Sequence, residues 1–352
     1  YAPPTTRSWL ADAGALFDIG LQGESSSHDP EQVGPYRLLS PLGEGGLGVV
    51  WKAEQSHPIQ RQVALKLIRP GLHLNREVLA RFEQERELLA KMSHPGIAAL
   101  YDAGTSEDGR PWFAMELLSG EILTSFCNHH QLPLRERVAL FILVCDAVHH
   151  AHQKGVIHRD LKPSNILVTQ VNGRPVPKVI DFGIARLLES DAATVFATRI
   201  GEMPSATYPY MSPEQAGSGS SALDTRSDIY TLGVILYELL TGKLPMPEEL
   251  TRSQDFLRMA QWIREGEPVR PSSLGHAHLR GELDWIVLKA MAREPARRYN
   301  SAAALSDDLR RYLDDHAVEA RPPSTAYLLG KWIKRHRAAV IASAMVLISL
   351  VA

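Results

Sequence analysis

Apolar residues alternate with polar ones over short stretches early in the chain, and they recur at helical spacing later. Between residues 36 and 117 the pattern predicts strands and one helix. The strands are expected at 36–42, 49–54, 62–68, 98–103 and 112–117, and the helix at 75–92. After Gly120 it predicts helices at 134–153, 226–241, 254–264, 283–291 and 302–313, with short strands at 166–168 and 178–180. We therefore expect an α+β protein with two lobes, a small β-rich lobe with one main helix and a larger helical lobe. A boundary near residues 118–120 would suit a small-molecule site.

The two ends of the chain differ from this pattern. Residues 1–35 are rich in Pro, Ser, Gly and Asp, which favours a flexible segment. Residues 338–352 are apolar or small apart from two serines, and the basic stretch 331–337 with its tryptophan precedes them. A membrane span needs about 20 residues, and basic residues with Trp are typical of its cytoplasmic edge. We expect a basic juxtamembrane linker at 314–337 and the start of a transmembrane helix at 338–352; a buried C-terminal helix is the alternative.

Composition narrows the classes of function. The 352 residues are 44% hydrophobic and 22% charged, which is enough to fill a sizeable core. The formal net charge of −2 gives no general attraction to nucleic acid, and we expect no nucleic-acid partner. The two cysteines, Cys127 and Cys145, lie in apolar helical stretches without metal-site spacing. We expect both to be buried free thiols, which fits a reducing cytoplasm.

A glycine-rich stretch separates the first two predicted strands. Residues 43–50 read Gly-Glu-Gly-Gly-Leu-Gly-Val-Val, with the spacing G-x-G-x-x-G. Glycines let a turn bring backbone N–H groups close to phosphate oxygens. A tight hairpin without a ligand would use the same residues. A dinucleotide-binding loop requires a helix next, and residues 49–52 favour a strand, so that fold is disfavoured.

A lysine on the third strand has a candidate partner on the predicted helix. Strand alternation places Lys66 on the same face as Ala64. Glu85 lies three residues after Phe82 and four before Leu89, on the apolar face of the helix. A carboxylate there needs a cation, because an unpaired buried charge is costly. Lys66 is the candidate, and such a pair would direct the lysine to the α- and β-phosphates. A lone strand lysine is otherwise a solvated charge.

The strongest motif follows the long predicted helix. Residues 158–165 read His-Arg-Asp-Leu-Lys-Pro-Ser-Asn. In this pattern Asp160 can accept a hydroxyl proton, Lys162 can neutralise a transferred phosphoryl group, and Asn165 can bind Mg²⁺. Asp181 opens an Asp-Phe-Gly sequence at the end of an apolar strand, sixteen residues after Asn165. Asp181 would bind the metal that bridges the phosphates.

Taken together, these motifs resemble the protein kinase family from residue 36 to residue 313. The resemblance implies the two-lobed kinase fold, with an N-lobe at 36–118 and a C-lobe at 119–313. It implies ATP with Mg²⁺, or Mn²⁺, as cofactors. It also implies an ion pair between Glu214 and Arg298, and a buried Asp228 that braces the catalytic loop.

By the same resemblance, Met115 is the gatekeeper and residues 116–118 form the hinge that meets adenine. The residues expected around ATP are Leu42, Gly43, Glu44, Gly45, Gly46, Leu47, Gly48, Val50, Ala64, Lys66, Met115, Glu116, Leu118 and Leu167.

Lys162 after the catalytic Asp is similar to kinases that act on serine or threonine. Residues 176–183 and 210–215 look like eukaryotic-type bacterial kinases, whose receptor forms place the kinase domain at the cytoplasmic side of a single span in the cell membrane. The resemblance therefore implies protein substrates. Two rivals remain: a pseudokinase scaffold, which predicts the loss of a catalytic group, and a small-molecule kinase, which the intact Ser-Pro-Glu at 212–214 disfavours.

Regulation is a further expectation from the resemblance. Arg159 precedes the catalytic Asp, and in the family such an arginine receives a phosphate on the activation loop. Thr194 and Thr198 are the phosphosite candidates, modified by a second copy in a homodimer. Thr207 is assigned to structure. Alternatively, Arg159 only braces the loop through backbone contacts.

Overall fold

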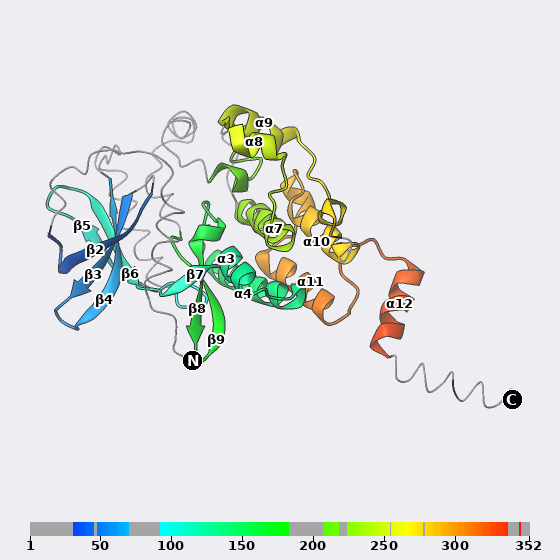
Figure 1. Cartoon of the computed structure of the whole chain (residues 1–352), viewed down its shortest axis with the longest axis horizontal. Helices are drawn as coiled ribbons and strands as arrows, with labels where there is room; N and C mark the ends of the chain where they lie inside the picture. The colour runs from blue at the N-terminus through cyan, green and yellow to red at the C-terminus, as the bar shows by residue number, and fades with distance from the viewer. Residues whose placement is uncertain are drawn as a thin grey trace. The chain divides into compact units, whose positions relative to one another are not determined.

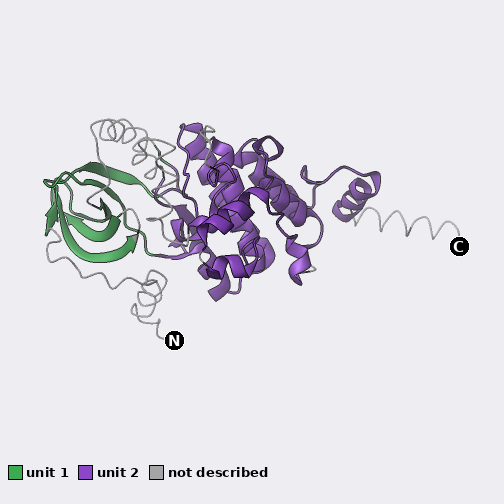
Figure 2. Ribbon diagram, turned by 90° about the horizontal axis from the view of Figure 1, so that it is seen from above, with its two compact units in different colours: residues 1–93, 98–119, 184–204 green, residues 94–97, 120–183, 205–352 purple. Residues whose placement is uncertain are grey.

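The computed structural model describes residues 31–45, 48–69, 92–182, 207–217, 224–253, 255–276, 279–336 and 345 (Figure 1). The chain divides into two compact units (Figure 2). Unit 1 takes residues 1–93, 98–119 and 184–204, and unit 2 takes residues 94–97, 120–183 and 205–352. The predicted division into a strand-rich and a helix-rich part is confirmed.

Among the described residues of unit 1, six strands form an antiparallel sheet in the order β1-β2-β3-β4-β6-β5. The strands are β1 (Gln32–Val33), β2 (Tyr36–Gly45), β3 (Gly48–Gln55), β4 (Arg61–Ile68), β5 (Leu100–Thr105) and β6 (Pro111–Glu116). Each strand predicted in this region is present. The two-residue strand β1 was not predicted; it extends the sheet into the segment expected to be flexible, whose residues 1–30 lie outside the described residues. The predicted helix at 75–92 also lies outside them, apart from Met92.

The two faces of this sheet have different roles. One face forms a buried apolar cluster. Its members are Val33, Tyr36, Ala53, Val63, Leu65, Leu67, Trp112 and Ala114. The strand register places Val50 and Phe113 opposite Lys66, and Met115 opposite Ala64, on the other face. The apolar cluster therefore fixes the sheet from one side and leaves Lys66 on the other.

Unit 2 is mainly helical (Figure 1). Its helices are α3 (Leu123–His129), α4 (Leu134–Gln153), α7 (Thr225–Thr241), α8 (Glu248–Ser253), α9 (Phe256–Glu265), α10 (Glu282–Ala290), α11 (Ala302–Leu313) and α12 (Thr325–Arg335). A second sheet contains β7 (Gly120–Ile122), β8 (Ile166–Val171) and β9 (Arg174–Val179). The predicted bounds of α4 and α11 agree with the structure. The helix predicted at 254–264 is instead α9, which begins after its cap Asp255 and follows the separate helix α8.

Helix α7 is buried over most of its length. Its N-cap Asp224 accepts a hydrogen bond from the backbone N–H of Arg226, and Gly242 ends the helix with a φ of 70°, a conformation that favours glycine.

Both cysteines, Cys127 in α3 and Cys145 in α4, are buried and free, as predicted. Burial raises the pKa of Cys127 to about 11, so the thiol stays protonated at neutral pH.

The segment predicted as a juxtamembrane linker is partly helical. The segment 314–337 contains the helix α12 within unit 2. Among the described residues, no helix is long and apolar enough to cross a membrane. The predicted span at 338–352 lies outside these residues except for Met345.

Candidate active site

The loop at 158–165 is anchored to α7 by one buried carboxylate. Asp228 accepts hydrogen bonds from the backbone N–H groups of His158 and Arg159, at 2.8 and 2.9 Å. The Nε2 atom of His152, at the end of α4, lies 2.8 Å from the same carboxylate. Arg159 has a φ of 65°, so the loop turns sharply just before Asp160. Asp228 therefore fixes the backbone that carries the candidate base.

The environment of Asp228 keeps it ionised. Burial on its own would raise the pKa of this carboxyl, but the hydrogen bond and charge of His152 and the backbone N–H of His158 outweigh burial. The net effect holds the pKa of Asp228 below its ordinary value. An ionised, fully bonded carboxylate can brace the loop over the neutral pH range.

A second set of contacts joins this loop to the end of β9. The ring of His158 lies 3.0 Å from the carbonyl oxygen of Ile180 through Nε2, and it packs on Phe182 with 4.7 Å between ring centroids. The N–H of Ile180 donates to the carbonyl oxygen of Asn165. Asp181 follows with a φ of 62°. These contacts fix the backbone on both sides of Asp181.

One carboxylate oxygen of Asp160 is hydrogen-bonded, and the other has no hydrogen-bond partner among the described residues. The Nζ atom of Lys162 donates to Asp160 Oδ2 at 3.1 Å and to the Thr207 hydroxyl at 2.9 Å. Asp160 Oδ1 is enclosed and has no hydrogen-bond partner among the described residues. Because an enclosed carboxylate oxygen needs a donor, this atom is suited to a hydroxyl group from a substrate.

Asn165 is oriented by the same loop. Its side-chain amide nitrogen donates to the carbonyl oxygen of Asp160 at 2.8 Å, and the amide oxygen, which can only accept, is the atom able to bind a cation. Among the described residues, no group of three or more His, Cys, Asp or Glu side chains forms a metal cage. Oxygen atoms of Asn165 and Asp181 fit a hard divalent cation that completes its coordination with phosphate and water.

Gln215 ties the catalytic loop to the segment at 207–217. Its amide nitrogen donates to the carbonyl oxygen of Arg159 at 2.7 Å. Its amide oxygen accepts from the N–H and the hydroxyl of Ser212, both at 3.0 Å. Motif reasoning did not identify Gln215 or His152 as contacts of this loop. The sequence signal for Gln215 was its position directly after Glu214. The signal for His152 was its position six residues before His158.

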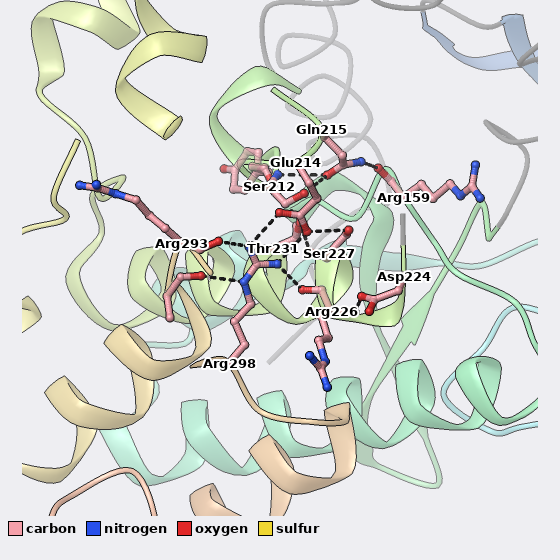
Figure 3. A network of polar contacts seen from close by, with 12 residues as sticks. Arg159, Ser212, Glu214, Gln215, Asp224, Arg226, Ser227, Thr231, Arg293 and Arg298 are labelled. Atoms are coloured by element: carbon pink, nitrogen blue, oxygen red, sulfur yellow. Dashed lines mark hydrogen bonds and ion pairs between the residues drawn. The ribbon is translucent and has the colours of Figure 1, made fainter. Parts of the chain in front are cut away.

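Next to Gln215, Glu214 and Arg298 form a bidentate ion pair at 2.7 and 2.8 Å, as the resemblance implied (Figure 3). The Ser227 hydroxyl also donates to Glu214 at 2.7 Å. The remaining donors of Arg298 bond to the carbonyl oxygens of Ala292, Arg226 and Arg293. Burial would raise the pKa of Glu214, but Arg298 and Ser227 outweigh it and hold the pKa below its usual value.

In unit 1, the glycine-rich residues lie at the ends of β2 and β3. A Cβ atom at Gly48 would fall 2.1 Å from the carbonyl oxygen of Leu67, so only glycine fits there. Glu44 pairs with Arg69 at the surface. Lys66 is buried.

Other residues expected around ATP are spread over both units. The end of β6 is held in register by Glu116, whose N–H donates to the carbonyl oxygen of Ala99 at 2.8 Å. Leu118 follows in unit 1, and Leu167 lies in β8 of unit 2. Several expected site residues lie outside the described residues. These are Gly46, Leu47, Glu85, Thr194 and Thr198.

A family model described as the protein kinase domain matches residues 36–309. The chain belongs to the protein kinase family. It is 38% identical over 292 residues to the serine/threonine-protein kinase PknB of Mycolicibacterium smegmatis, covering 81% of this chain and 44% of that one. It is 36% identical to Pkn1 of Myxococcus xanthus, covering 84% and 41%. The chain therefore spans less than half the length of these relatives.

A solved kinase domain has the same fold. The PknI kinase domain of Mycobacterium tuberculosis matches with a TM-score of 0.60 and 25% identity, over 80% of this chain and 97% of that one. The protein kinase fold predicted from the motifs is thus confirmed.

Proposed function

We propose that this protein kinase transfers the γ-phosphoryl group of Mg²⁺-ATP to serine and threonine hydroxyls of other proteins. The observation that carries this proposal is the arrangement of Asp160, Lys162 and Thr207. The free Oδ1 of Asp160 can accept the proton of a substrate hydroxyl, and Lys162, held by Asp160 and Thr207, supplies a fixed positive charge beside it. The similar relatives named serine/threonine-protein kinases support the choice of acceptor.

Nucleotide and metal binding are assigned to residues of both units. Lys66 and the glycine-rich residues of β2 and β3 would contact the phosphates, and Asn165 and Asp181 would hold Mg²⁺, or Mn²⁺ in its place. The bound metal neutralises charge on the phosphates, which favours attack by the acceptor oxygen. Glu85 would align Lys66.

The two rival functions make different predictions. A pseudokinase would lack a catalytic group, but Lys66, Asp160, Asn165 and Asp181 are all present. A small-molecule kinase would not need a braced segment after the activation loop for protein docking. The segment containing Glu214 is held by Arg298, Ser227 and Gln215 contacts, which favours a protein substrate.

The acceptor can be identified from the reaction product. The purified chain is incubated with Mg²⁺ and ATP labelled in the γ-phosphate, together with a protein mixture. Acid hydrolysis of the labelled protein is expected to release phosphoserine and phosphothreonine. Label only in phosphotyrosine, or only in small molecules, would contradict the proposal.

We also propose that the kinase is of the single-pass membrane type, with residues 338–352 in the span and the kinase domain on the cytoplasmic side. The apolar run and its basic flank support this proposal. Fractionation and protease protection of cells expressing the full protein test it. A kinase found in the soluble fraction would contradict it.

Regulation by a second copy is a further part of the proposal. Thr194 and Thr198 would be phosphorylated within a homodimer, and tethering would favour the encounter. Mass spectrometry after incubation with Mg²⁺-ATP tests both sites. An active wild type with neither threonine modified would contradict it, and so would full activity in the Thr194→Ala, Thr198→Ala variant.

A further inference from the structure

Helix α12 has one side that forms hydrogen bonds and ion pairs with other parts of unit 2, and another side that exposes large apolar residues. Tyr327 and Lys331 are the half-buried residues of the helix, and both contact Glu282 at the start of α10. The Lys331 Nζ atom lies 2.7 Å from the Glu282 carboxylate, and both side chains are largely enclosed. Tyr327 is hydrogen-bonded to Glu282 through its hydroxyl group, which also accepts from the N–H of Val318.

The contacts extend along one face of the helix. Lys334, one turn after Lys331, pairs with Asp315 at 2.6 Å. The guanidinium of Arg321 lies 4.2 Å from the ring centroid of Tyr327. At 100° per residue, positions 327, 331 and 334 share one side of the helix. This side is therefore joined to unit 2 by charges and hydrogen bonds.

The opposite side exposes large apolar side chains. A soluble amphipathic helix normally buries such residues and exposes its charges, so the arrangement here is reversed. The four residues are Leu328, Leu329, Trp332 and Ile333, with exposed fractions of 46%, 57%, 50% and 40%. We refer to them as the outer face of α12. Among the described residues, the one ring contact of these four side chains is that of Trp332 with His336, the residue just after the helix.

The charges around the outer face indicate what covers it. Helix α12 contains no acidic residue, and Lys334 and Arg335 in its last turn are followed by His336 and Arg337. Lys334 pairs with Asp315 but keeps a largely exposed side chain. A second copy would bring the same positive charges against these, and four side chains are too few for a stable protein interface. Exposed leucines with a tryptophan and flanking basic residues are typical of a helix that lies in the interface of an anionic bilayer.

We propose that α12 is an interfacial helix whose outer face lies in the headgroup region of a bilayer containing anionic lipid, while Glu282 holds its other side to the kinase unit. The inference rests on the proposed membrane location of the chain. The kinase unit would then contact the lipid directly through the outer face of α12, in addition to being tethered by the span that follows.

Labels on two sides of the helix test this orientation. The full chain is made with Leu329→Cys or with Gly330→Cys and labelled with an environment-sensitive fluorophore. Gly330 is the matched control because it is exposed, lies about 40° from Lys334 and about 60° from Tyr327 around the helix, and has no atom within 4 Å of an added Cβ. The native Cys127 and Cys145 are buried. Vesicles of phosphatidylcholine are compared with vesicles that contain about one-third phosphatidylserine.

We expect the emission of the label at position 329, but not at position 330, to shift to the blue on the anionic vesicles. An equal shift at both positions would overturn the proposal, because the helix would then be carried into the lipid without orientation. An equal response to both kinds of vesicle would overturn the role of anionic lipid. A shift without vesicles that depends on protein concentration would show that a second copy covers the face.

Substitutions separate α12 from the segment that follows it. The Leu328→Ser, Trp332→Ser variant is expected to bind the anionic vesicles about tenfold more weakly, with residues 338–352 unchanged. The control is Leu257→Ser in α9, which removes a leucine that is 64% exposed elsewhere in unit 2. Unchanged binding in the double variant would overturn the proposal. Phosphoryl transfer, measured on the same proteins without lipid, reports separately on the proposed function.

Discussion

The guanidinium of Arg298 holds the carboxylate of Glu214 with two hydrogen bonds, at 2.7 and 2.8 Å, across 84 residues of sequence. The Arg298 side chain is fully enclosed, and the pair stands beside Gln215, which bonds to the catalytic loop. The pair thus connects the stability of unit 2 with the position of the segment at 207–217.

Removing this arginine should destabilise the protein strongly. Arg298→Ala leaves the Glu214 carboxylate and several carbonyl oxygens without donors, and we expect a loss of about 3 kcal/mol or more in the free energy of unfolding. Arg298→Lys should recover only part, because a lysine cannot form the bidentate pair. The neighbouring ion pair of Arg297 with Glu294 is exposed on both sides, so Arg297→Ala should cost less than about 1 kcal/mol. Urea unfolding measures all three; equal losses at positions 297 and 298 would contradict the account.

The ion pair of Glu214 with Arg298 should also make the free energy of unfolding depend on pH in the acid range. The pKa of Glu214 is lower in the folded protein than its ordinary value of 4.5. As the pH falls through that value, the unfolded chain binds protons first, so the stability from this group is present above pH 4.5 and is lost below it. The Glu214→Gln variant should lose less stability than the wild type between neutral pH and this acid range. The control Glu249→Gln, at an exposed position of α8, should follow the wild type. Parallel curves for wild type and Glu214→Gln would exclude this role.

Much of the fold followed from sequence because its signals are local. The periodicity of α4 and α11 and the alternation in β2 to β4 depend on neighbours a few residues apart. The residues at 158–165 were located for the same reason. By contrast, the contact of His152 with Asp228 spans 76 residues, and that of Gln215 with Arg159 spans 56. Such contacts depend on how helices pack, which spacing alone does not reveal.

The segment at 314–337 shows this limit most clearly. Its basic residues and tryptophan, next to an apolar run, indicated a juxtamembrane linker. The acidic partner of Lys331 is Glu282, 49 residues earlier in the chain. The contact of α12 with α10 could therefore not be read from the segment itself.

Thr207 is expected to act by positioning Lys162. Thr207→Val removes the hydroxyl group that accepts from the lysine Nζ, and we expect turnover to fall roughly tenfold because a hydrogen bond to a charged group is lost. Thr207→Ser keeps the hydroxyl group and should retain most of the activity. Steady-state kinetics of the purified variants separates kcat from KM for ATP. Equal loss in both variants would indicate that the methyl group, and not the hydrogen bond, matters.

Lys66 and Glu85 are predicted from the sequence to act as one pair. Lys66→Met and Glu85→Gln should each reduce turnover severely, and the double variant should be little worse than either single variant. A double-mutant cycle on kcat/KM for ATP measures the coupling. If the double variant lost the product of the two single losses, the residues would act independently.

Asp160 is assigned to accept the proton of the substrate hydroxyl through its Oδ1 atom. A comparison of phosphoryl transfer and ATP binding in the wild type and in Asp160→Asn tests this role. We expect turnover in the variant to be lower by roughly 10²–10⁴-fold, the usual contribution of a positioned base, with ATP affinity nearly unchanged. Turnover near that of the wild type in this variant, with the same affinity for ATP, would contradict it.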